Sequence, residues 1–307
     1  MQSIQKIKEE MRFNVYIAEL MEILKGIAVS EYWTLFKKQG RFKRFMDAFN
    51  GFFDILDFSN VDHPFAKSAG KLAILMVTSN EGFMGGLNGR VIEAALANPE
   101  SREAVLIMVG EQGAAHLEKL KRPFKGFAGV ATDQTYTAAV ELRNYIIGEV
   151  KRGAFQGLVV YYPRSISFMV QKVEGLRILP CVELFQKRSL APLLEQNKGG
   201  AVPDETEDLI IESSLYEMIQ YLVETWILQK FFEIFEESKL AEFSARTVHL
   251  EESFQLLRER GKGIKFQYLR SWHELIDKGM RDIFSAQIIR RKVKRSLNAN
   301  AAVSGKT

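Results

Sequence analysis

Residues 78–89 form a glycine-rich segment, TSNEGFMGGLNG, which is the part of the sequence best suited to hold a phosphate. It follows an apolar run and precedes a helical pattern, and backbone N–H groups at the start of a helix can bind phosphate. Its glycine spacing matches neither the dinucleotide fingerprint nor the P-loop, and no Lys-Ser or Lys-Thr pair follows. The sequence therefore favours a tight strand-to-helix turn, built on Gly82, Gly85, Gly86 and Asn88, in which the glycines permit positive φ angles.

Metal-binding and nucleophilic side chains are too scattered to form a recognisable site. The four histidines share no short ligand spacing, so no metal site is expected. They are His63, His116, His249 and His273. Cys181 is the only cysteine, which excludes an intramolecular disulfide and favours a reducing compartment. Since no Ser-His-Asp or Cys-His arrangement can be placed, the sequence predicts no catalytic residue and no cofactor.

The charges are nearly balanced, with 42 Lys and Arg against 38 Asp and Glu and a net charge of +4. A nucleic-acid-binding domain is usually far more basic, so no nucleic-acid partner is expected. Glu237 and Glu242 are expected to be solvated or ion-paired. A late basic run is attributed to the end of a helix, where the macrodipole favours cations, ahead of the alternative that it meets an acidic surface. Its members are Arg290, Arg291, Lys292, Lys294 and Arg295.

The elements that position these residues begin with a proline-free segment, residues 3–57. Its apolar residues recur at intervals of three and four, which predicts an amphipathic helix. They are Ile4, Ile7 and Met11, followed by Ile17, Met21, Leu24 and Ala28. The register shifts once between Met11 and Ile17, so the stripe is not a strict heptad seam.

A second proline-free segment covers residues 209–295 and is longer than an ordinary globular helix, which is typical of a coiled coil or a stalk. Gly261 and Gly263 mark one place where it could bend or break. Unbroken, the two helices would be roughly 80 Å and 130 Å long. A central domain is nearer 35 Å across, so the helices must project and bury their stripes against each other or a partner.

Between them, apolar strands alternate with helical patterns, which predicts a parallel-type sheet covered on both faces. The expected strands are residues 71–77, 104–109 and 157–162, and the expected helices are residues 87–97, 111–120 and 133–151. Residues 165–179 alternate more weakly and are expected to add an edge strand or hairpin. The fold class is therefore α/β with long terminal helices.

We predict four segments: an N-terminal coiled-coil helix (1–60), an α/β domain (68–200), a C-terminal coiled-coil helix (206–296) and a disordered tail (297–307). The first six residues lack the apolar core of a signal peptide. No stretch of 18 residues is both uncharged and strongly apolar, so no transmembrane span is expected. Any contact with a membrane should come through partners.

Two motifs give the chain a family resemblance. Residues 78–88 resemble the hallmark turn of the gamma subunit of F-type ATP synthases, T-S-D-x-G-L-x-G-G-L-N, with changes at Asn80 and Phe83. Residues 237–246 resemble the family's E-S-x-x-S-E-x-x-A-R run. Without a gap, Tyr268, Ile276, Asp282 and Ile283 fall where that family has Tyr, Ile, Glu and Ile. The resemblance covers almost the whole chain.

The departures from the family pattern lie mainly late in the last helix. The family usually carries Asn, Arg and Gln where this chain has Leu269, Trp272 and His273. About 24 residues follow Ile283, which is more than the family usually has. The chain is thus identified as a divergent member.

The resemblance implies a non-catalytic rotor shaft: a Rossmann-like α/β domain flanked by two terminal helices in an antiparallel coiled coil. The shaft would lie inside a ring of three alpha and three beta subunits, with the α/β domain contacting epsilon and the membrane ring of c subunits. It also implies a peripheral position on the cytoplasmic face and coupling of proton or sodium flow to ATP synthesis or hydrolysis.

The resemblance also suggests which residues contact the head. These candidates are Met21, Glu237, Ser238, Arg246, Leu269, Trp272, His273 and Ile276. Two alternatives stay open. One is a shaft-like structural adaptor outside an ATP synthase, and the other is a nucleotide-binding enzyme that uses the turn at 78–89.

Overall fold

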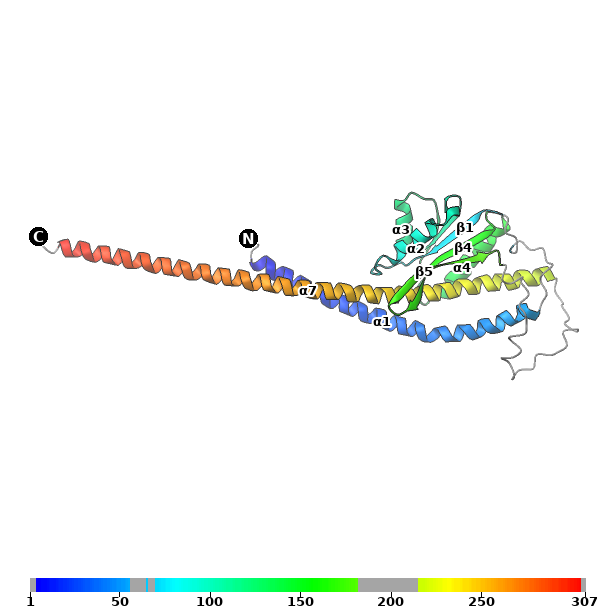
Figure 1. Cartoon of the computed structure of the whole chain (residues 1–307), viewed down its shortest axis with the longest axis horizontal. Coiled ribbons are helices and arrows are strands. Elements are labelled where there is room, and N and C mark those ends of the chain that lie inside the picture. Colours follow the sequence, from blue (N-terminus) through cyan, green and yellow to red (C-terminus); the bar gives the residue numbers. More distant parts are fainter. Residues whose placement is uncertain (1–3, 56–64, 66–69, 182–214, 305–307) are drawn as a thin grey trace. The chain divides into compact units, whose positions relative to one another are not determined.

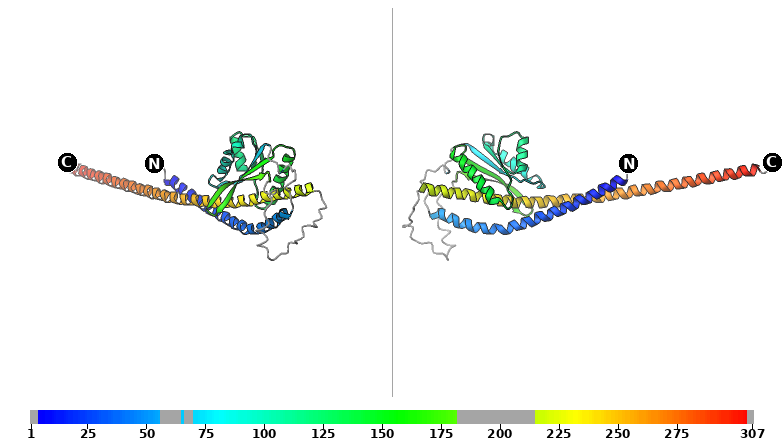
Figure 2. Two further views of the ribbon diagram at one scale, coloured as in Figure 1. Left: turned by 45° about the vertical axis from the view of Figure 1, so that its right-hand side comes forward. Right: turned by 180° about the vertical axis from the view of Figure 1, so that it is seen from behind.

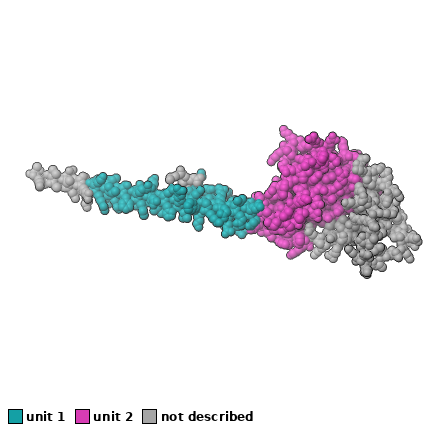
Figure 3. Space-filling model, in the orientation of Figure 1, with its two compact units in different colours: residues 1–24, 251–307 teal, residues 25–250 magenta. Residues whose placement is uncertain are grey.

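The computed structural model describes residues 4–55, 65, 70–181 and 215–304, with side chains given except at 39–55, 215 and 294–304. The chain divides into two compact units, coloured in Figure 3. Unit 1 consists of residues 1–24 and 251–307, and unit 2 of residues 25–250. Residues 182–214, which include the end of the α/β domain predicted at 68–200, lie outside the described residues.

Unit 2 is built on a five-stranded sheet with the order β3-β2-β1-β4-β5. Its strands are β1 (Leu72–Val77), β2 (Val105–Val109), β3 (Lys125–Phe127), β4 (Gly157–Ser167) and β5 (Val170–Leu179). The first four strands in this order are parallel, and β5 runs antiparallel to β4 as the predicted edge hairpin. β1 is buried at every residue, which is why it reads as a continuous apolar run. The α/β prediction is confirmed.

Helices cover both faces of this sheet (Figures 1 and 2). α2 (Leu87–Leu96) and α3 (Glu111–Lys119) pack on one face, where Ile74, Met76 and Met108 form a buried cluster with them. α4 (Thr135–Lys151) packs on the other face. Beside it lies the first part of α7 (Leu215–Ser304), which contributes the buried Phe231 and Phe235 to the same core. The last helix is therefore part of the core of unit 2.

The N-terminal helix α1 (Ile4–Ile55) also packs on α7 within unit 2. Ala28, Tyr32 and Leu35 form a buried cluster with Leu240 and Phe243 of α7. The charge of Lys38 acts on Glu236, whereas Tyr32 packs with Leu240 and Phe243, so residue numbers fall along one helix as they rise along the other and the two helices are antiparallel here.

Within unit 1, α1 and α7 are joined by a polar and an ionic contact. Asn14 Nδ2 donates to the Leu257 carbonyl at 2.9 Å, and Arg260 pairs with Glu10 at 2.8 Å. Ile7 and Ile264 are buried. The predicted antiparallel pairing of the two terminal helices is confirmed, and in this unit residues 10–14 meet residues 257–260.

α7 runs without a break through Gly261 and Gly263 and ends at Ser304. It therefore includes residues 297–304, where the sequence predicted a disordered tail. A break needs a residue that disrupts the backbone hydrogen bonds, and glycine within a helix costs only about 1 kcal/mol. The apolar stripes of α1 and α7 pack against each other, and this packing stabilises α7 as a continuous helix.

Candidate functional site

The glycine-rich turn leaves the carboxyl end of β1 and enters α2. Asn88, in the first turn of α2, stabilises the turn through two hydrogen bonds with Ser79. Its Nδ2 donates to Ser79 Oγ at 2.9 Å, and its Oδ1 accepts a hydrogen bond from the Ser79 backbone N–H at 3.2 Å. Gly85 and Gly86 have φ angles of 56° and 80°, as predicted. Gly82 does not use this freedom, and Phe83 takes a positive φ of 64° beside it.

This turn lies at the switch point of the sheet, where α/β folds of this kind usually bind ligands. The chain passes from β1 to β2 on one side and later to β4 on the other, so the crevice opens at the carboxyl ends of β1 and β4. Here α7 fills the crevice with Phe235, Ser238 and Glu242, leaving a cavity of about 20 Å³. That is room for roughly one water molecule, and far too little for a nucleotide.

Arg246 ties α7 to the turn. Its Nη2 lies 2.7 Å from Glu242 Oε1 and 3.1 Å from Glu81 Oε2, and its Nε donates to the Gly82 carbonyl at 3.4 Å. The guanidinium carbon also lies 5.4 Å from the centre of the Phe243 ring. Arg246 and Glu242 are both buried, so one ionic cluster on α7 holds the loop that the sequence had singled out.

A second polar cluster links α7 to the β4–β5 hairpin. Tyr162 Oη donates to Glu237 Oε2 at 3.1 Å, and Arg164 lies 3.4 Å from Glu237 and 2.9 Å from Glu174. Burial raises the pKa of Glu237, although Arg164 and the Tyr162 hydroxyl favour its carboxylate form. Burial, followed by the charge of Glu237, also raises the pKa of Tyr162. The hairpin is therefore anchored to the helix by groups whose charge depends on pH.

We expect Glu237→Gln to change how stability depends on pH. Because the folded chain raises the pKa of Glu237 above that of an ordinary glutamate, wild-type stability should fall as pH rises above about 4.5. Gln cannot titrate, so the free energy of unfolding of the variant should rise relative to wild type over that range. Urea unfolding at a series of pH values measures this difference. Glu252→Gln, at an exposed carboxylate on the same helix, is the control, and a difference that is constant with pH would contradict the assignment.

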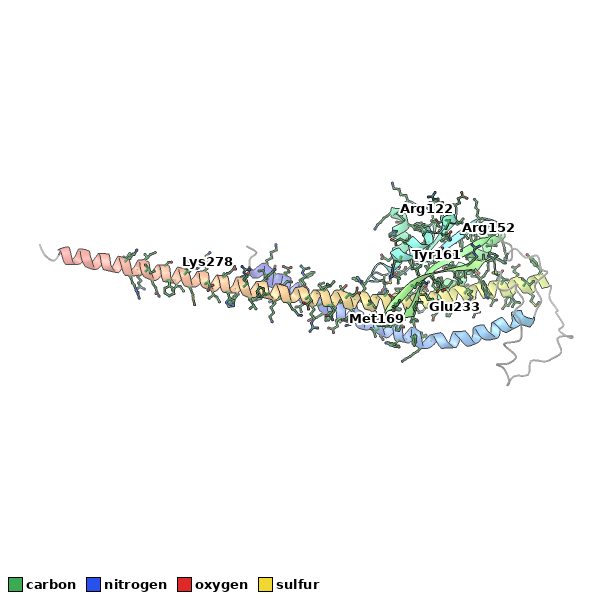
Figure 4. All side chains as sticks on the ribbon, in the orientation of Figure 1. Arg122, Arg152, Tyr161, Met169, Glu233 and Lys278 are labelled. Carbon is green, nitrogen blue, oxygen red and sulfur yellow. The ribbon has the colours of Figure 1, made fainter. Side chains whose placement is uncertain are left out.

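The tip of the hairpin is wedged between α1 and α7 within unit 2. Ser244 Oγ donates to the Phe168 carbonyl at 3.0 Å, and the Phe168 ring meets Tyr32 edge-on, with centroids 4.8 Å apart. Figure 4 labels the neighbouring Met169 at this tip. Sequence reasoning missed this contact, because single aromatic residues in a hairpin and a helix carry no periodic signal.

The eight predicted contact residues fall into two groups. Glu237, Ser238 and Arg246 face their own chain in unit 2 and are largely buried there. In unit 1, Met21 is half-buried, and the remaining four are exposed on α7. These four are Leu269, Trp272, His273 and Ile276.

The exposed residues belong to a longer apolar stripe in unit 1. Leu269, Trp272, Ile276, Met280 and Ile283 recur at intervals of three and four, so they lie along one side of α7. Their exposed fractions range from 39% for Ile276 to 61% for Ile283. The Trp272 ring stacks on Tyr268 at 6.4 Å. An apolar stripe of this length, uncovered by the described part of the chain, marks an interaction surface.

No described helix contains a stretch apolar enough to cross a bilayer. Among the described residues, no group of three or more His, Cys, Asp or Glu side chains could hold a metal ion.

Comparisons with known proteins agree with this architecture. A family model described as ATP synthase matches residues 3–287. The ATP synthase gamma chain of Ruminococcus albus is 22% identical over 286 residues, covering 89% of this chain and 94% of that protein. The gamma chain of Acetobacterium woodii, described as sodium ion specific, is 23% identical over 208 residues, or 65% and 68% of the two chains.

Solved structures show the same fold. A chain of the Euglena gracilis mitochondrial ATP synthase, in its OSCP/F1/c-ring structure, has a TM-score of 0.67 at 15% identity, covering 95% of this chain and 96% of that one. A chain of the rotor structure from the same organism has a TM-score of 0.63 at 16% identity, covering 89% and 99%. With the family match over residues 3–287, the conclusion is that this chain belongs to the gamma-chain family of ATP synthases.

Proposed function

We propose that this chain is the rotating shaft that couples ion flow through a membrane ring to ATP synthesis or hydrolysis in a head of alpha and beta subunits. As a gamma-family chain it is a central-stalk subunit, and it is not catalytic by itself. The observation that carries the coupling role is the exposed apolar stripe from Leu269 to Ile283, which needs a partner surface.

The mechanism follows from contacts that differ around the shaft. A helix with an apolar side and a polar side presents a different surface to each of three surrounding catalytic subunits. Each subunit then favours the conformation that the facing surface binds best, so rotation shifts their nucleotide affinities in turn. The nucleotides would be held by the partners, which agrees with a switch-point crevice already filled by α7.

Contacts within unit 2 connect the α/β domain to α7, so that force applied to the domain can turn the helix. The Arg246 and Glu237 clusters and the hairpin tip join the sheet to α7 at three places. We infer that the α/β domain contacts epsilon and the c ring on the cytoplasmic face, and that torque applied there turns α7. The membrane would be reached only through these partners.

We expect the purified chain to hydrolyse no ATP and to form a complex with its cognate alpha and beta subunits. The reason is that α7 fills the crevice at the switch point of the sheet, while the α7 stripe lacks a cover. Phosphate release by the isolated chain and size-exclusion chromatography of the mixture test the two statements. ATP turnover by the isolated chain that is lost in an Asn88→Ala variant would favour the nucleotide-binding alternative.

A structural adaptor outside an ATP synthase is the second candidate, because Trp272 and His273 replace the polar residues usual in the family. The reconstituted complex separates the two functions. A shaft should permit ATP-driven ion pumping, whereas an adaptor should bind no alpha–beta ring.

A further inference from the structure

Ser238 of α7 carries a buried hydroxyl group that the contacts of the chain leave without a partner. The residue is 7% exposed, and its Oγ neither donates nor accepts a hydrogen bond within the described part of the chain. A hydroxyl in a helix commonly donates to the carbonyl four residues earlier, as Thr247 does to Phe243 at 2.8 Å. Because a buried polar group without a partner is costly and uncommon in proteins, the Ser238 hydroxyl needs an explanation.

The Ser238 side chain lines the small cavity that α7 leaves at the switch point of the sheet. This cavity measures about 20 Å³. A single water molecule needs roughly 10–15 Å³ and a polar surrounding. Ser79 and Asn88 line the cavity from the glycine-rich turn, and Glu242 lines it from α7, one helical turn after Ser238. The cavity is therefore both large enough and polar enough for one water molecule.

The polar side chains around this cavity keep capacity for further hydrogen bonds. Asn88 Nδ2 uses one of its two protons on Ser79 Oγ, which leaves the second proton available. Each carboxylate oxygen of Glu242 takes part in one ion pair and keeps a further lone pair. A water molecule can accept a hydrogen bond from Asn88 and donate to Ser238 and Glu242, which makes the three bonds that are typical of a buried water.

The charges at the cavity favour a neutral ligand over an ion. Glu242 lies 2.8 Å from Lys239 Nζ and 2.7 Å from Arg246 Nη2, so its carboxylate is already neutralised. The cavity thus offers no unpaired charge that would repay the desolvation of a metal ion. Its volume also excludes an anion as large as phosphate. Water is the ligand that fits both the size and the charge.

We propose that this cavity holds one buried water molecule, which bridges Ser238 of α7 to Asn88 of the glycine-rich turn. Ser238 is then a positioning residue that acts inside unit 2 through the water, in place of the contact with the head that the family resemblance suggested. The bridge supplements the contacts that Arg246 makes with Glu81 and Gly82 of the same turn. The inference does not depend on the proposed function, because it rests on the cavity and the unpaired hydroxyl alone.

A substitution at Ser238 gives opposite results for a hydrated and a dry cavity. If the water is bound, Ser238→Ala removes one of its hydrogen bonds and should lower the folding equilibrium constant by about fivefold. In a dry cavity the same change removes an unpaired buried hydroxyl, so it should raise that constant. Urea unfolding of the full chain measures the difference. Ser101→Ala is the control, because Ser101 is also buried but donates directly to the Leu96 carbonyl at 2.9 Å, and this variant should be less stable than wild type in either case.

A count of the bound water molecules tests the bridge itself. Oxygen-17 magnetic relaxation dispersion of the folded chain detects waters that stay bound for longer than the protein takes to tumble. Ser238→Ala should show one such water fewer than wild type, whereas Ser101→Ala should show the wild-type number. A higher folding constant in Ser238→Ala, or an unchanged count of bound waters, would overturn the proposal. It would also be overturned if wild-type stability depended on Na⁺ or K⁺ and Ser238→Ala abolished that dependence, because the ligand would then be a metal ion.

Discussion

Gly110→Ala is expected to destabilise unit 2 by about 3–5 kcal/mol. Gly110 lies between β2 and α3 with a φ of 105°, a conformation that costs a residue with a side chain about 1–3 kcal/mol. A Cβ atom there would lie 2.3 Å from the Thr78 carbonyl oxygen and 2.6 Å from Thr78 Oγ1. Forcing such atoms apart typically costs a further 1–3 kcal/mol. The neighbour cannot move freely, because Thr78 N and Oγ1 both donate to the Val109 carbonyl at 2.8 Å.

Urea unfolding of the full chain, followed by the fluorescence of the buried Trp226, measures this loss. Gly89→Ala is the matched control, because Gly89 lies within α2 and a Cβ there would meet nothing within 4 Å. That change should stabilise the protein by about 0.5–1 kcal/mol, since alanine favours helix over glycine. If Gly110→Ala unfolds at the wild-type urea concentration, the packing of β1 against β2 at Thr78 is not as described.

The sheet and its helices could be predicted closely because each leaves a local pattern. Continuous apolar runs gave strands that differ from β1 and β2 by a single residue at the start. Of the residues predicted as an edge strand or hairpin, 165–167 extend β4 and 170–179 form β5, which ends just before Pro180. Such patterns depend only on residues that are close together in the sequence, so a single sequence is enough to recognise them.

The contacts of α7 could not be predicted in the same way. Ser238 was expected to contact a partner and Glu242 to be solvated or ion-paired, yet both fill a crevice formed by strands more than 70 residues earlier. The pairing of α1 with α7 shows the same limit. Apolar periodicity identifies each buried face, but the register depends on contacts such as Asn14 with Leu257, which a search for apolar stripes overlooks.

Trp272→Ala is expected to weaken binding of the chain to its alpha–beta ring by about 10–100-fold, and to lower ATP-driven ion pumping. The side chain of Trp272 is 44% exposed in the chain alone. Its indole ring stacks on Tyr268, so the indole is already oriented for contact with a partner. Covering the remaining indole surface is worth about 2–3 kcal/mol, and aromatic side chains of this kind often dominate an interface. The resembling family carries Arg here, which has five N–H donors where Trp has one. The partner surface should therefore be apolar or aromatic in this assembly, with Trp272 buried in it.

Leu256→Ala is the control for this prediction. Leu256 is an apolar residue of the same helix and is 72% exposed, but it lies about 160° around the helix from Trp272, on the side away from the apolar stripe. Its removal should change affinity by less than threefold, because isolated exposed residues outside an interface contribute little. Trp272→Arg should not restore binding, since a fixed charge facing an apolar surface costs more free energy than its hydrogen bonds return. Affinity is measured by titrating labelled chain into the ring, and pumping by acidification of vesicles that carry the complex. Wild-type affinity and pumping in Trp272→Ala would place this side chain in solvent within the assembly, and the stripe from Leu269 to Ile283 would then not be the surface that the head contacts.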